Sequence, residues 1–487
     1  MISYISTRNE KNGISGREAI LKGIADDGGL YVPDSLEELK LDYRLLMGQS
    51  YIDMAKTIFY KFFPDFGEDV ISEIVDKSYK NKFETSEITP VVKVGDDYVL
   101  ELFHGATAAF KDVALSALPN LMSKAKELMG VNEETLILTA TSGDTGSAAL
   151  HGFSDVAGTK IVVFYPKDGI SETQRLQMVT ESGSNTKACG IIGNFDDAQN
   201  GVKEIFSSIP RPCEGVALSS ANSINIGRLV PQVVYYFYAY SRLVENKEIK
   251  IGDKVRFIVP TGNFGDIMAG YFALNMGLPI GELICASNCN DVLTEFLATG
   301  HYNRKREFVK TISPSMDILI SSNLERLLYF ISGEEKTKYY MKQLKEKGEY
   351  QISRDELNEI KEVFVGISSD DEEGKLEIAG LERKENYLID THTAMGFAAL
   401  SKYDKRKNMK NVVLSTASAY KFSRVVLEAI GETPSAGDFE NIKKLSEITD
   451  VKVPKLLKEI FSKEERHRDV IEVKEMKNYV LDAAKNL

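Results

Sequence analysis

The chain has 487 residues, of which 43% are hydrophobic and 27% are charged, and this length is sufficient for about two to four compact units with a large core. Its 60 Lys and Arg residues and 72 Asp and Glu residues give a net charge of −12, which argues against a general electrostatic attraction to nucleic acids or anionic membranes. We therefore expect neither a nucleic-acid partner nor a membrane partner.

Cysteine, histidine and N-terminal patterns narrow the class of protein further. Four cysteines are too few for a disulfide scaffold in this chain, so reduced thiols in a cytoplasmic protein are expected. The five histidines do not have the spacing of metal ligands, so no metal site is expected. No secretory signal is visible, and the most apolar stretch, 229–240, falls short of the roughly 20 residues that span a bilayer.

In chain order, residues 1–95 predict an N-terminal subdomain with helix-like patterns and a turn at 26–29. From about residue 135 the sequence alternates β-branched runs, glycine-containing turns and amphipathic helices, which is the pattern of a parallel α/β sheet. The expected strands are 135–140, 160–165, 255–259, 282–287 and 411–416.

This alternation predicts two open parallel-sheet α/β domains after the N-terminal subdomain. The expected limits are 96–250 for a smaller, mobile domain and 251–447 for a larger one, followed by a C-terminal tail, 448–487. A polar stretch at about 336–384 predicts a peripheral insertion in the larger domain, and its acidic run at 368–373 is typical of solvated surface.

The segment 101–112 contains one lysine, Lys111, within a run of small and apolar residues. Desolvation lowers the pKa of such a lysine and favours the neutral amine that a Schiff base requires. Lys111 is therefore a candidate catalytic nucleophile. The alternative is a lysine that extends its ammonium to solvent and pairs with Asp112, and the segment alone does not decide between the two.

The loop 261–266 follows a strand-like run and opens a helix-like one, so its backbone N–H groups can hold a phosphate. It lacks the ending of a P-loop and the dinucleotide-binding fingerprint. A tight strand-to-helix turn without a ligand is the alternative. The candidate phosphate-binding residues are Gly262, Asn263, Phe264, Gly265 and Asp266.

Two further segments are suited to small anions. The loop 141–146 adds hydroxyls to a similar turn, with Ser142, Gly143, Asp144 and Thr145 as candidates; Asp144 would repel an anion unless it caps the next helix. The segment 222–228 places amides, a hydroxyl and a guanidinium near a helix start, which suits a dianionic group; an ordinary ion pair is the alternative for the guanidinium. Its candidates are Asn222, Ser223, Asn225 and Arg228.

Three further polar residues are considered as candidate site residues from their residue type and position in the sequence. Thr416 ends a strand-like run and would lie at the carboxyl edge of the sheet, where open α/β folds bind ligands; capping the next helix is the alternative. His104 and His392 titrate near neutral pH, but lone histidines are more often structural, and neither receives a chemical role.

A lysine in apolar surroundings and three anion-binding segments together suggest pyridoxal 5'-phosphate and an anionic amino-acid substrate. The chain resembles the threonine synthases, of the longer bacterial and fungal type. The segment around Lys111 is similar to the family's cofactor-lysine motif, 261–266 to its cofactor-phosphate loop and 142–146 to its substrate-carboxylate loop. Further similar segments are 6–8, 27–33, 314–318, 322–323, 415–417 and 421–422.

This resemblance implies the pyridoxal-phosphate fold type II and a role for each candidate. Lys111 would bind the cofactor covalently, 262–266 would hold its phosphate region, and Thr416 would face its pyridine nitrogen. Residues 142–145, Asn222, Ser223, Asn225 and Arg228 would bind the substrate.

The implied activity is that of a carbon–oxygen lyase acting on a phosphate. Phosphate would be eliminated from Cγ of O-phospho-L-homoserine and water added at Cβ to give L-threonine, the last step of threonine biosynthesis, in a monomer or a homodimer. Two alternatives remain open: a serine or threonine dehydratase-like lyase, whose substrate has no phosphate, and a non-catalytic homologue that binds pyridoxal phosphate or a phosphorylated metabolite. The intact Lys111 counts against the second alternative.

Overall fold

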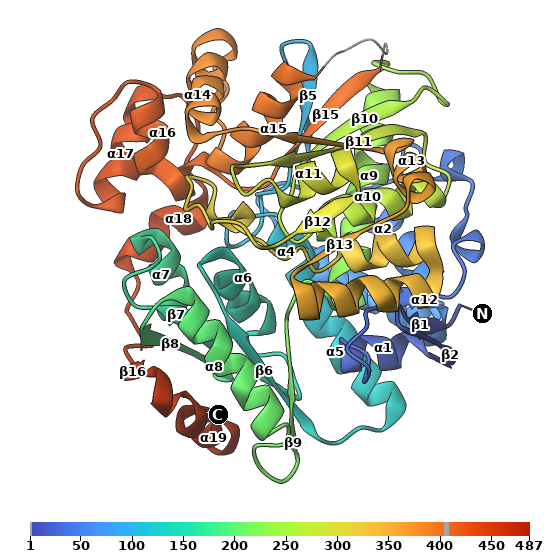
Figure 1. Cartoon of the computed structure of the whole chain (residues 1–487). Helices are drawn as coiled ribbons and strands as arrows, with labels where there is room; N and C mark the ends of the chain where they lie inside the picture. Colours follow the sequence, from blue (N-terminus) through green and yellow to red (C-terminus); the bar gives the residue numbers. More distant parts are fainter. Residues whose placement is uncertain (1, 404–408) are drawn as a thin grey trace.

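The computed structural model describes residues 2–403 and 409–487 and contains two α/β lobes, each built around one open sheet (Figure 1). The larger lobe has the strand order β14-β11-β10-β15-β5-β4, and the smaller lobe has the order β16-β8-β7-β6-β9. The expectation of two open, mainly parallel sheets is confirmed.

In the larger sheet, five neighbouring strands run parallel and β4 is an antiparallel edge strand. Strand β10 is buried at every residue, as is typical of parallel strands that helices cover on both faces. The strands of this sheet are β4 (Val91–Val94), β5 (Asp97–Glu101), β10 (Val255–Pro260), β11 (Ile280–Ser287), β14 (Phe364–Ser368) and β15 (Lys410–Ser415).

The smaller sheet is parallel throughout. Helices α8 (Phe195–Ser208) and α19 (Met476–Asn486) share an apolar core with its strands, in which Met476 and Val480 lie with Leu136 (Figure 1). The strands are β6 (Glu134–Ala140), β7 (Thr159–Pro166), β8 (Thr186–Ile192), β9 (Val216–Ser219) and β16 (Val470–Glu472), and the other helices of this region are α4 (Lys111–Leu115), α5 (Leu118–Met129), α6 (Asp144–Phe153) and α7 (Glu172–Val179).

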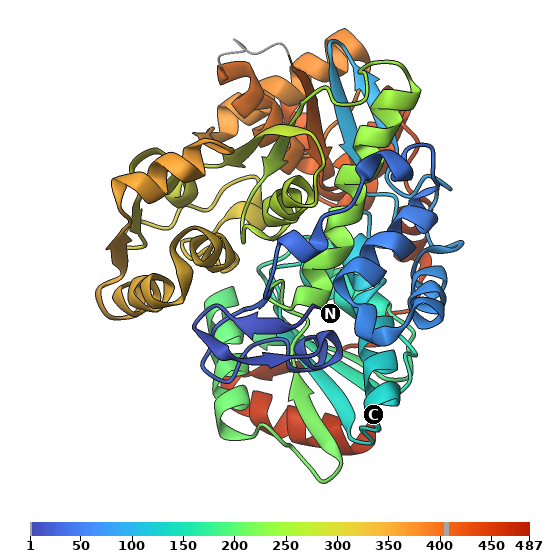
Figure 2. The same ribbon diagram turned by 90° about the vertical axis from the view of Figure 1, so that its right-hand side faces the viewer.

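The N-terminal region contains a three-stranded antiparallel sheet that the sequence patterns did not predict, visible as dark-blue arrows near the N label in Figure 2. Arg8 donates to both carboxylate oxygens of Glu325 at 2.8 and 2.7 Å and joins this region to the larger lobe. The strands and α-helices of the N-terminal region are β1 (Tyr4–Ser6), β2 (Asn9–Ile14), α1 (Gly16–Lys22), β3 (Tyr31–Pro33), α2 (Tyr51–Phe62) and α3 (Glu68–Tyr79).

The remaining elements surround the larger sheet or connect the lobes. The helices are α9 (Ile226–Glu245), α10 (Gly265–Asn275), α11 (Val292–Thr299), α12 (Leu324–Lys347), α13 (Arg354–Lys361), α14 (Asp371–Glu385), α15 (Thr391–Lys402), α16 (Ser423–Ala429), α17 (Asp438–Ile448) and α18 (Lys455–Glu459). Strand β12 (His301–Asn303) pairs antiparallel with β13 (Glu349–Gln351), and the short 3-10 helices include η4 (Pro314–Met316) and η5 (Ala419–Phe422).

Strand pairing differs from the expected domain limits at three places. Strand β5 falls within 96–250 but pairs with β15 of the larger sheet, and β16 of the expected tail pairs with β8 of the smaller sheet. Strand β14 falls within the expected peripheral insertion but pairs with β11. These pairings join segments far apart in the sequence, so no local pattern could indicate them.

The acidic run at 368–373 also has a specific structural role. Asp370 accepts a hydrogen bond from the Glu373 N–H at 2.8 Å, and the Glu373 carboxylate accepts one from the Asp370 N–H at 2.9 Å. This reciprocal capping box begins helix α14. Part of the run therefore sets a helix start rather than only covering the surface.

Among the residues of 2–403 and 409–487, no helix combines the length and apolar character needed to cross a membrane. All four cysteines are free thiols, as expected.

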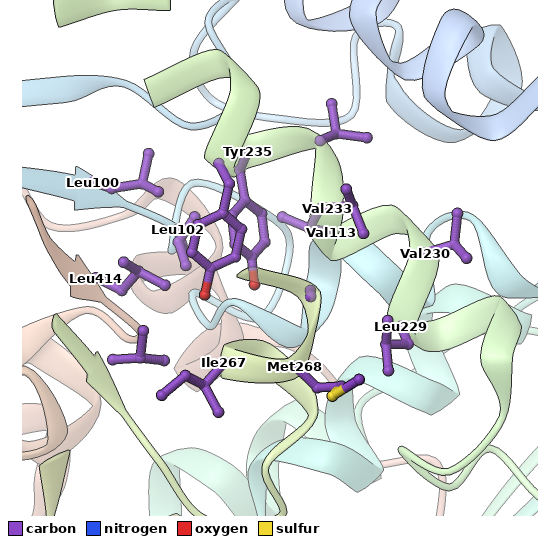
Figure 3. Close-up of a cluster of buried hydrophobic side chains, with 14 of the residues drawn as sticks. Leu100, Leu102, Val113, Leu229, Val230, Val233, Tyr235, Ile267, Met268 and Leu414 are labelled. Carbon is purple, nitrogen blue, oxygen red and sulfur yellow. The ribbon is translucent and has the colours of Figure 1, made fainter. Parts of the chain in front are cut away.

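Helix α9 is the central packing element, and its residues 226–241 are all buried. Side chains from four other elements meet those of α9, as Figure 3 shows for Leu100 of β5, Val113 of α4, Ile267 of α10 and Leu414 of β15 near Val233 of α9. Helix α4 begins at Lys111 and α10 begins at the expected phosphate loop. One apolar core therefore fixes the position of both.

Asn225 is the N-cap of α9, and its replacement should destabilise the fold. Its Oδ1 accepts from the Gly227 N–H and its Nδ2 donates to the Ile20 carbonyl, each at 2.9 Å. Asn225→Ala should lower the free energy of unfolding by about 1–2 kcal/mol, measured as a lower urea midpoint at unchanged slope. Asn225→Ser keeps a capping hydroxyl and should lose less. An unchanged midpoint for Asn225→Ala would contradict the capping role.

Candidate active site

A cavity of about 610 Å³ lies between the two lobes. Its walls include the start of α4 and the loops that follow β6, β10 and β15, and the three loops lie at the carboxyl ends of parallel strands. The predicted site residues that line it are Lys111, Ser142, Asp144, Thr145, Asn222, Ser223, Arg228, Gly262, Asn263, Phe264, Gly265, Asp266 and Thr416. Gly143 and Asn225 are not among the lining residues.

Lys111 is buried at the first position of α4, with 8% of its surface exposed. Its Nζ lies 4.5 Å from the centroid of the Phe110 ring and 3.8 Å from Asp144 Oδ2. Burial is the main cause that lowers the pKa of Lys111 to about 8. The amine is therefore far more readily neutral than an ordinary lysine.

The alternative pairing of Lys111 with Asp112 does not form. The Asp112 carboxylate accepts hydrogen bonds from the Thr107 N–H at 2.8 Å and the Thr107 hydroxyl at 2.7 Å. These two hydrogen bonds between Thr107 and Asp112 hold the turn before α4 and leave the amine of Lys111 facing the cavity.

The loop after β10 has the geometry of an anion site. Among the described residues, no acceptor pairs with the backbone N–H groups of 262–265 at the start of α10, where phosphates commonly bind. The loop is held from outside, because Ser321 Oγ donates to the Gly262 carbonyl at 2.9 Å and Asn323 Nδ2 donates to the Asn263 carbonyl at 3.0 Å. A Cβ on Gly262 would lie 2.7 Å from the Ser315 carbonyl oxygen, so only glycine fits there.

Asp266, at the second position of α10, is turned toward two tyrosines of α9. Its Oδ1 accepts hydrogen bonds from the hydroxyls of Tyr235 at 2.5 Å and Tyr236 at 2.9 Å. Its Oδ2 is buried and has no partner within the described part of the chain. Burial raises the pKa of Asp266 to about 6, so this carboxyl is more readily protonated than an ordinary aspartic acid.

The loop after β6 is capped by Thr141, whose Oγ1 accepts from the N–H groups of Gly143 at 3.0 Å and Gly146 at 2.9 Å. Gly143 has φ 140°, and a Cβ there would meet Gln174 at 2.4 Å. Asp144 does not cap α6, because it is the first residue of that helix and Gly143 occupies the cap position. Its carboxylate instead lies 2.8 Å from Lys421 Nζ.

Arg228 contributes a buried guanidinium beside Asn222 and Ser223 in the wall of the cavity. Its Nη1 donates to the Ala221 carbonyl at 2.7 Å, whereas its Nε has no partner among the described residues. No carboxylate pairs with it in the described ranges, so the ordinary ion pair does not form. Burial lowers the pKa of Arg228 to about 10, which leaves it cationic at neutral pH.

Asn225 belongs to the same segment as Arg228, 222–228, but does not line the cavity. Both polar atoms of its side-chain amide are used, by the start of α9 and by the Ile20 carbonyl. The structure gives this residue a capping position outside the cavity wall.

Thr416 follows β15 and joins this strand to the lysine segment. Its carbonyl accepts from the Phe110 N–H at 2.8 Å, and its N–H donates to Thr393 Oγ1 at 3.3 Å. Its hydroxyl has no hydrogen bond among the described residues. Thr416 therefore presents a free hydroxyl to the cavity.

Of the two histidines, only His392 lines the cavity. Its Nδ1 lies 2.8 Å from Asp390 Oδ1, and its Nε2 accepts from the Ser315 N–H at 3.2 Å. The ring thus connects Asp390, the N-cap of α15, to the loop around Ser315 at the cavity wall. His104 instead contacts Glu101 at 2.7 Å.

Sequence reasoning missed the polar partners of Asp144. Lys421, which belongs to the family-like segment 421–422 but received no role from the sequence, is buried and contacts the Asp144 carboxylate. Gln174 Nε2 donates to Asp144 Oδ1 at 2.9 Å. The Ser171–Gln174 capping box is visible as a spacing, but no spacing indicates the contact with Asp144.

The cavity fits the pyridoxal phosphate expected from the resemblance. This cofactor needs an amine for its carbonyl, donors for its phosphate and a partner for its ring nitrogen. Lys111 supplies a desolvated amine, the start of α10 supplies unpaired N–H groups, and Thr416 supplies a free hydroxyl.

Comparisons with known proteins agree with this chemistry. Residues 3–79 match the family description "Threonine synthase N terminus", residues 97–418 match "Pyridoxal-phosphate dependent enzyme", and residues 393–480 match "Threonine synthase, C-terminal". The second match covers most of the two lobes.

Individual relatives are similar over most of the chain. A threonine synthase from Pseudomonas aeruginosa is 37% identical over 89% of this chain and 91% of its own length. A solved structure of a threonine synthase from Brucella melitensis with bound pyridoxal phosphate superimposes with a TM-score of 0.89 at 36% identity, and each chain is covered to 100%. Threonine synthase-like 1 from Macaca fascicularis is 37% identical over 85% of this chain, which spans only 58% of that relative's length. The chain belongs to the threonine synthase family of pyridoxal-phosphate-dependent enzymes.

Proposed function

We propose that this protein is a threonine synthase that converts O-phospho-L-homoserine and water into L-threonine and phosphate. The observation that carries the proposal is the meeting, in one cavity, of a desolvated amine, a loop suited to the cofactor phosphate and a buried, unpaired guanidinium. Two separate anion-binding elements are what a phosphorylated cofactor and a phosphorylated substrate together require.

Each group in the cavity would have one binding task. The N–H groups of 262–265 would hold the cofactor phosphate, and the Thr416 hydroxyl would face the ring nitrogen. Ser142 and Thr145 would bind the substrate carboxylate, and Arg228 with Asn222 and Ser223 would bind the substrate phosphate through charge-assisted hydrogen bonds.

Lys111 would carry the proton transfers. When bound, pyridoxal phosphate supplies a covalent partner for the substrate amine and an electron sink for its carbon atoms. From the start of α4, the Lys111 Nζ would be placed to remove the proton from Cα of the bound substrate and to move protons at Cβ. A pKa near 8 suits this amine to act as both base and acid near neutral pH.

Water must be kept away until phosphate has left and then admitted to attack Cβ. Residues 142–145 belong to the smaller lobe, so substrate binding there would draw the lobes together. The cavity wall includes Phe308 and Ile320, which are 55% and 45% exposed. Closure of the lobes would cover these apolar side chains and exclude water.

The expected surroundings of the protein follow from the same proposal. A small phosphorylated amino acid is the only partner that the cavity calls for, and free thiols are in keeping with a cytoplasmic location. A monomer or a homodimer stays the prediction for its assembly.

Lys111→Ala should abolish the visible absorbance of bound cofactor and the release of phosphate from O-phosphohomoserine, because Lys111 supplies the amine at the start of α4 that faces the cavity. The matched control is Lys126→Arg. Lys126 is also buried, but it donates to Thr135 Oγ1 and the Gly158 carbonyl away from the cavity, so this variant should keep both signals. Turnover by Lys111→Ala would overturn the assignment.

Arg228→Ala should weaken binding of O-phosphohomoserine by about 1.5–3 kcal/mol, roughly a tenfold to hundredfold rise in KM. L-homoserine, which lacks the phosphate, should bind Arg228→Ala and the unchanged enzyme with similar affinity. Steady-state phosphate release and competition by L-homoserine measure the two effects. Equal losses of affinity for O-phosphohomoserine and L-homoserine would show that Arg228 does not bind the substrate phosphate.

Attachment of pyridoxal phosphate to the cofactor-free chain should accelerate with rising pH and level off above about pH 8. Only the neutral amine reacts, and burial lowers the pKa of Lys111 from 10.5 to about 8. Stopped-flow absorbance measures the rate. A rate that still rises between pH 9 and about pH 10.5 would indicate an ordinary lysine.

Product analysis separates the proposed reaction from its alternatives. Phosphate and threonine from O-phosphohomoserine support the proposal, whereas a keto acid formed from threonine without phosphate release supports a dehydratase. Cofactor binding without either product would support a binding protein.

A further inference from the structure

A second buried lysine lies next to the predicted cofactor lysine. Lys421 is at the third position of η5, and its side chain has 0% of its surface exposed. Its Nζ lies 2.8 Å from Asp144 Oδ1 and donates to the Thr107 carbonyl at 2.8 Å. A fully buried ammonium is costly unless it is paired and hydrogen-bonded, and these two contacts meet that requirement.

Lys421 joins three segments that form the cavity. Thr107 precedes Lys111, Asp144 begins α6, and Lys421 follows Thr416 by five residues. The ammonium of Lys421 is therefore a common point of attachment for the lysine segment, the expected carboxylate loop and the strand end of β15.

Asp144 lies between two ammonium groups. Its Oδ1 contacts Lys421 at 2.8 Å and accepts from Gln174 at 2.9 Å, whereas its Oδ2 is 3.8 Å from Lys111. The two lysines, Lys421 first, hold the pKa of Asp144 below its usual range against the opposing effect of burial. Asp144 is thus ionised, and Lys421 is its closer partner.

The charged groups that act most on Lys111 come from α4, α6, α9 and η5. Asp144 and Asp112 raise the pKa of Lys111, whereas burial, Lys421 and Arg228 lower it. Asp266 lies close enough to interact with Lys111 as well. Without Lys421, Asp144 would have only Lys111 as a nearby ammonium, and a buried carboxylate within 4 Å strongly favours the protonated amine.

We propose that Lys421 is a positioning residue, the fixed counter-ion that engages Asp144 and thereby makes the amine of Lys111 easier to deprotonate and available to the cofactor. This inference deepens the proposed function and rests on its assignment of Lys111 as the cofactor lysine. It also explains how a loop that contains Asp144 can accept an anionic carboxylate, because Lys421 neutralises the aspartate.

The test is the pH dependence of pyridoxal phosphate attachment to the full-length, cofactor-free chain, followed by absorbance. Lys421→Met should shift the midpoint upward by about one pH unit or more, because Asp144 then pairs with Lys111. Lys421→Met combined with Asp144→Asn removes the carboxylate as well, and its midpoint should return to that of the unchanged chain or below.

Asp144→Asn alone is the second variant if Lys421→Met does not fold, because an amide oxygen can still accept a hydrogen bond from Lys421, which also keeps its bond to the Thr107 carbonyl. Its midpoint should move to lower pH, since the carboxylate that favours the ammonium of Lys111 is gone while Lys421 remains. An unchanged midpoint in Asp144→Asn overturns the proposal.

The melting temperature of each variant, compared with its titration midpoint, distinguishes a positioning role of Lys421 from a purely structural one. A lower melting temperature for Lys421→Met with the same midpoint would mean that Lys421 only braces the fold, and this result overturns the proposal. The titration uses no substrate. A chain that shows the shifts but releases no phosphate from O-phosphohomoserine would therefore keep this inference and lose the proposed reaction.

Discussion

The burial of helix α9 is the constraint on which the rest of the structure depends. Its residues 226–241 have no exposed face, so every neighbouring element must pack against it. Helix α4, which begins at Lys111, and helix α10, which begins at the phosphate loop, both pack on α9 (Figure 3). The distance between the reactive amine and the expected phosphate position is therefore set by close-packed side chains.

Charge in the cavity is balanced locally, independently of the net charge of −12. Three cationic side chains at or beside the cavity, Lys111, Lys421 and Arg228, are buried. Two of the buried carboxylates there also have partners, because Asp144 is paired with Lys421 and Asp266 accepts from two tyrosine hydroxyls. The acidic surplus lies on the outer surface, whereas the groups proposed to meet small anions are N–H donors of 262–265 and the Arg228 guanidinium, which have no acceptor and no carboxylate partner, respectively, in the described part of the chain. Binding of two phosphates is thus compatible with an acidic protein.

Local patterns predicted the elements that carry the site. The expected strands 135–140 and 255–259 correspond to β6 (Glu134–Ala140) and β10 (Val255–Pro260), because β-branched runs followed by glycine turns are local signals. The partners of these elements were not predictable in this way. Lys421 reaches Asp144 only after the chain has folded, and the structural use of Asn225 depends on the Ile20 carbonyl. Residue types indicated the chemistry, and tertiary contacts decide which residue performs it.

The smaller lobe is not one continuous piece of chain. Its sheet is completed by β16, and its apolar core by Met476 and Val480 of α19, while its first four strands lie between residues 134 and 219. Strand β9 ends at residue 219 and β16 begins at residue 470. During synthesis, residues 220–469, more than half of the chain, must therefore follow β9 before strand β8 gains its neighbour β16. The lobe that carries Asp144 can reach its final packing only after β16 and α19 have been synthesised, so assembly of a competent cavity waits for segments far downstream of β9.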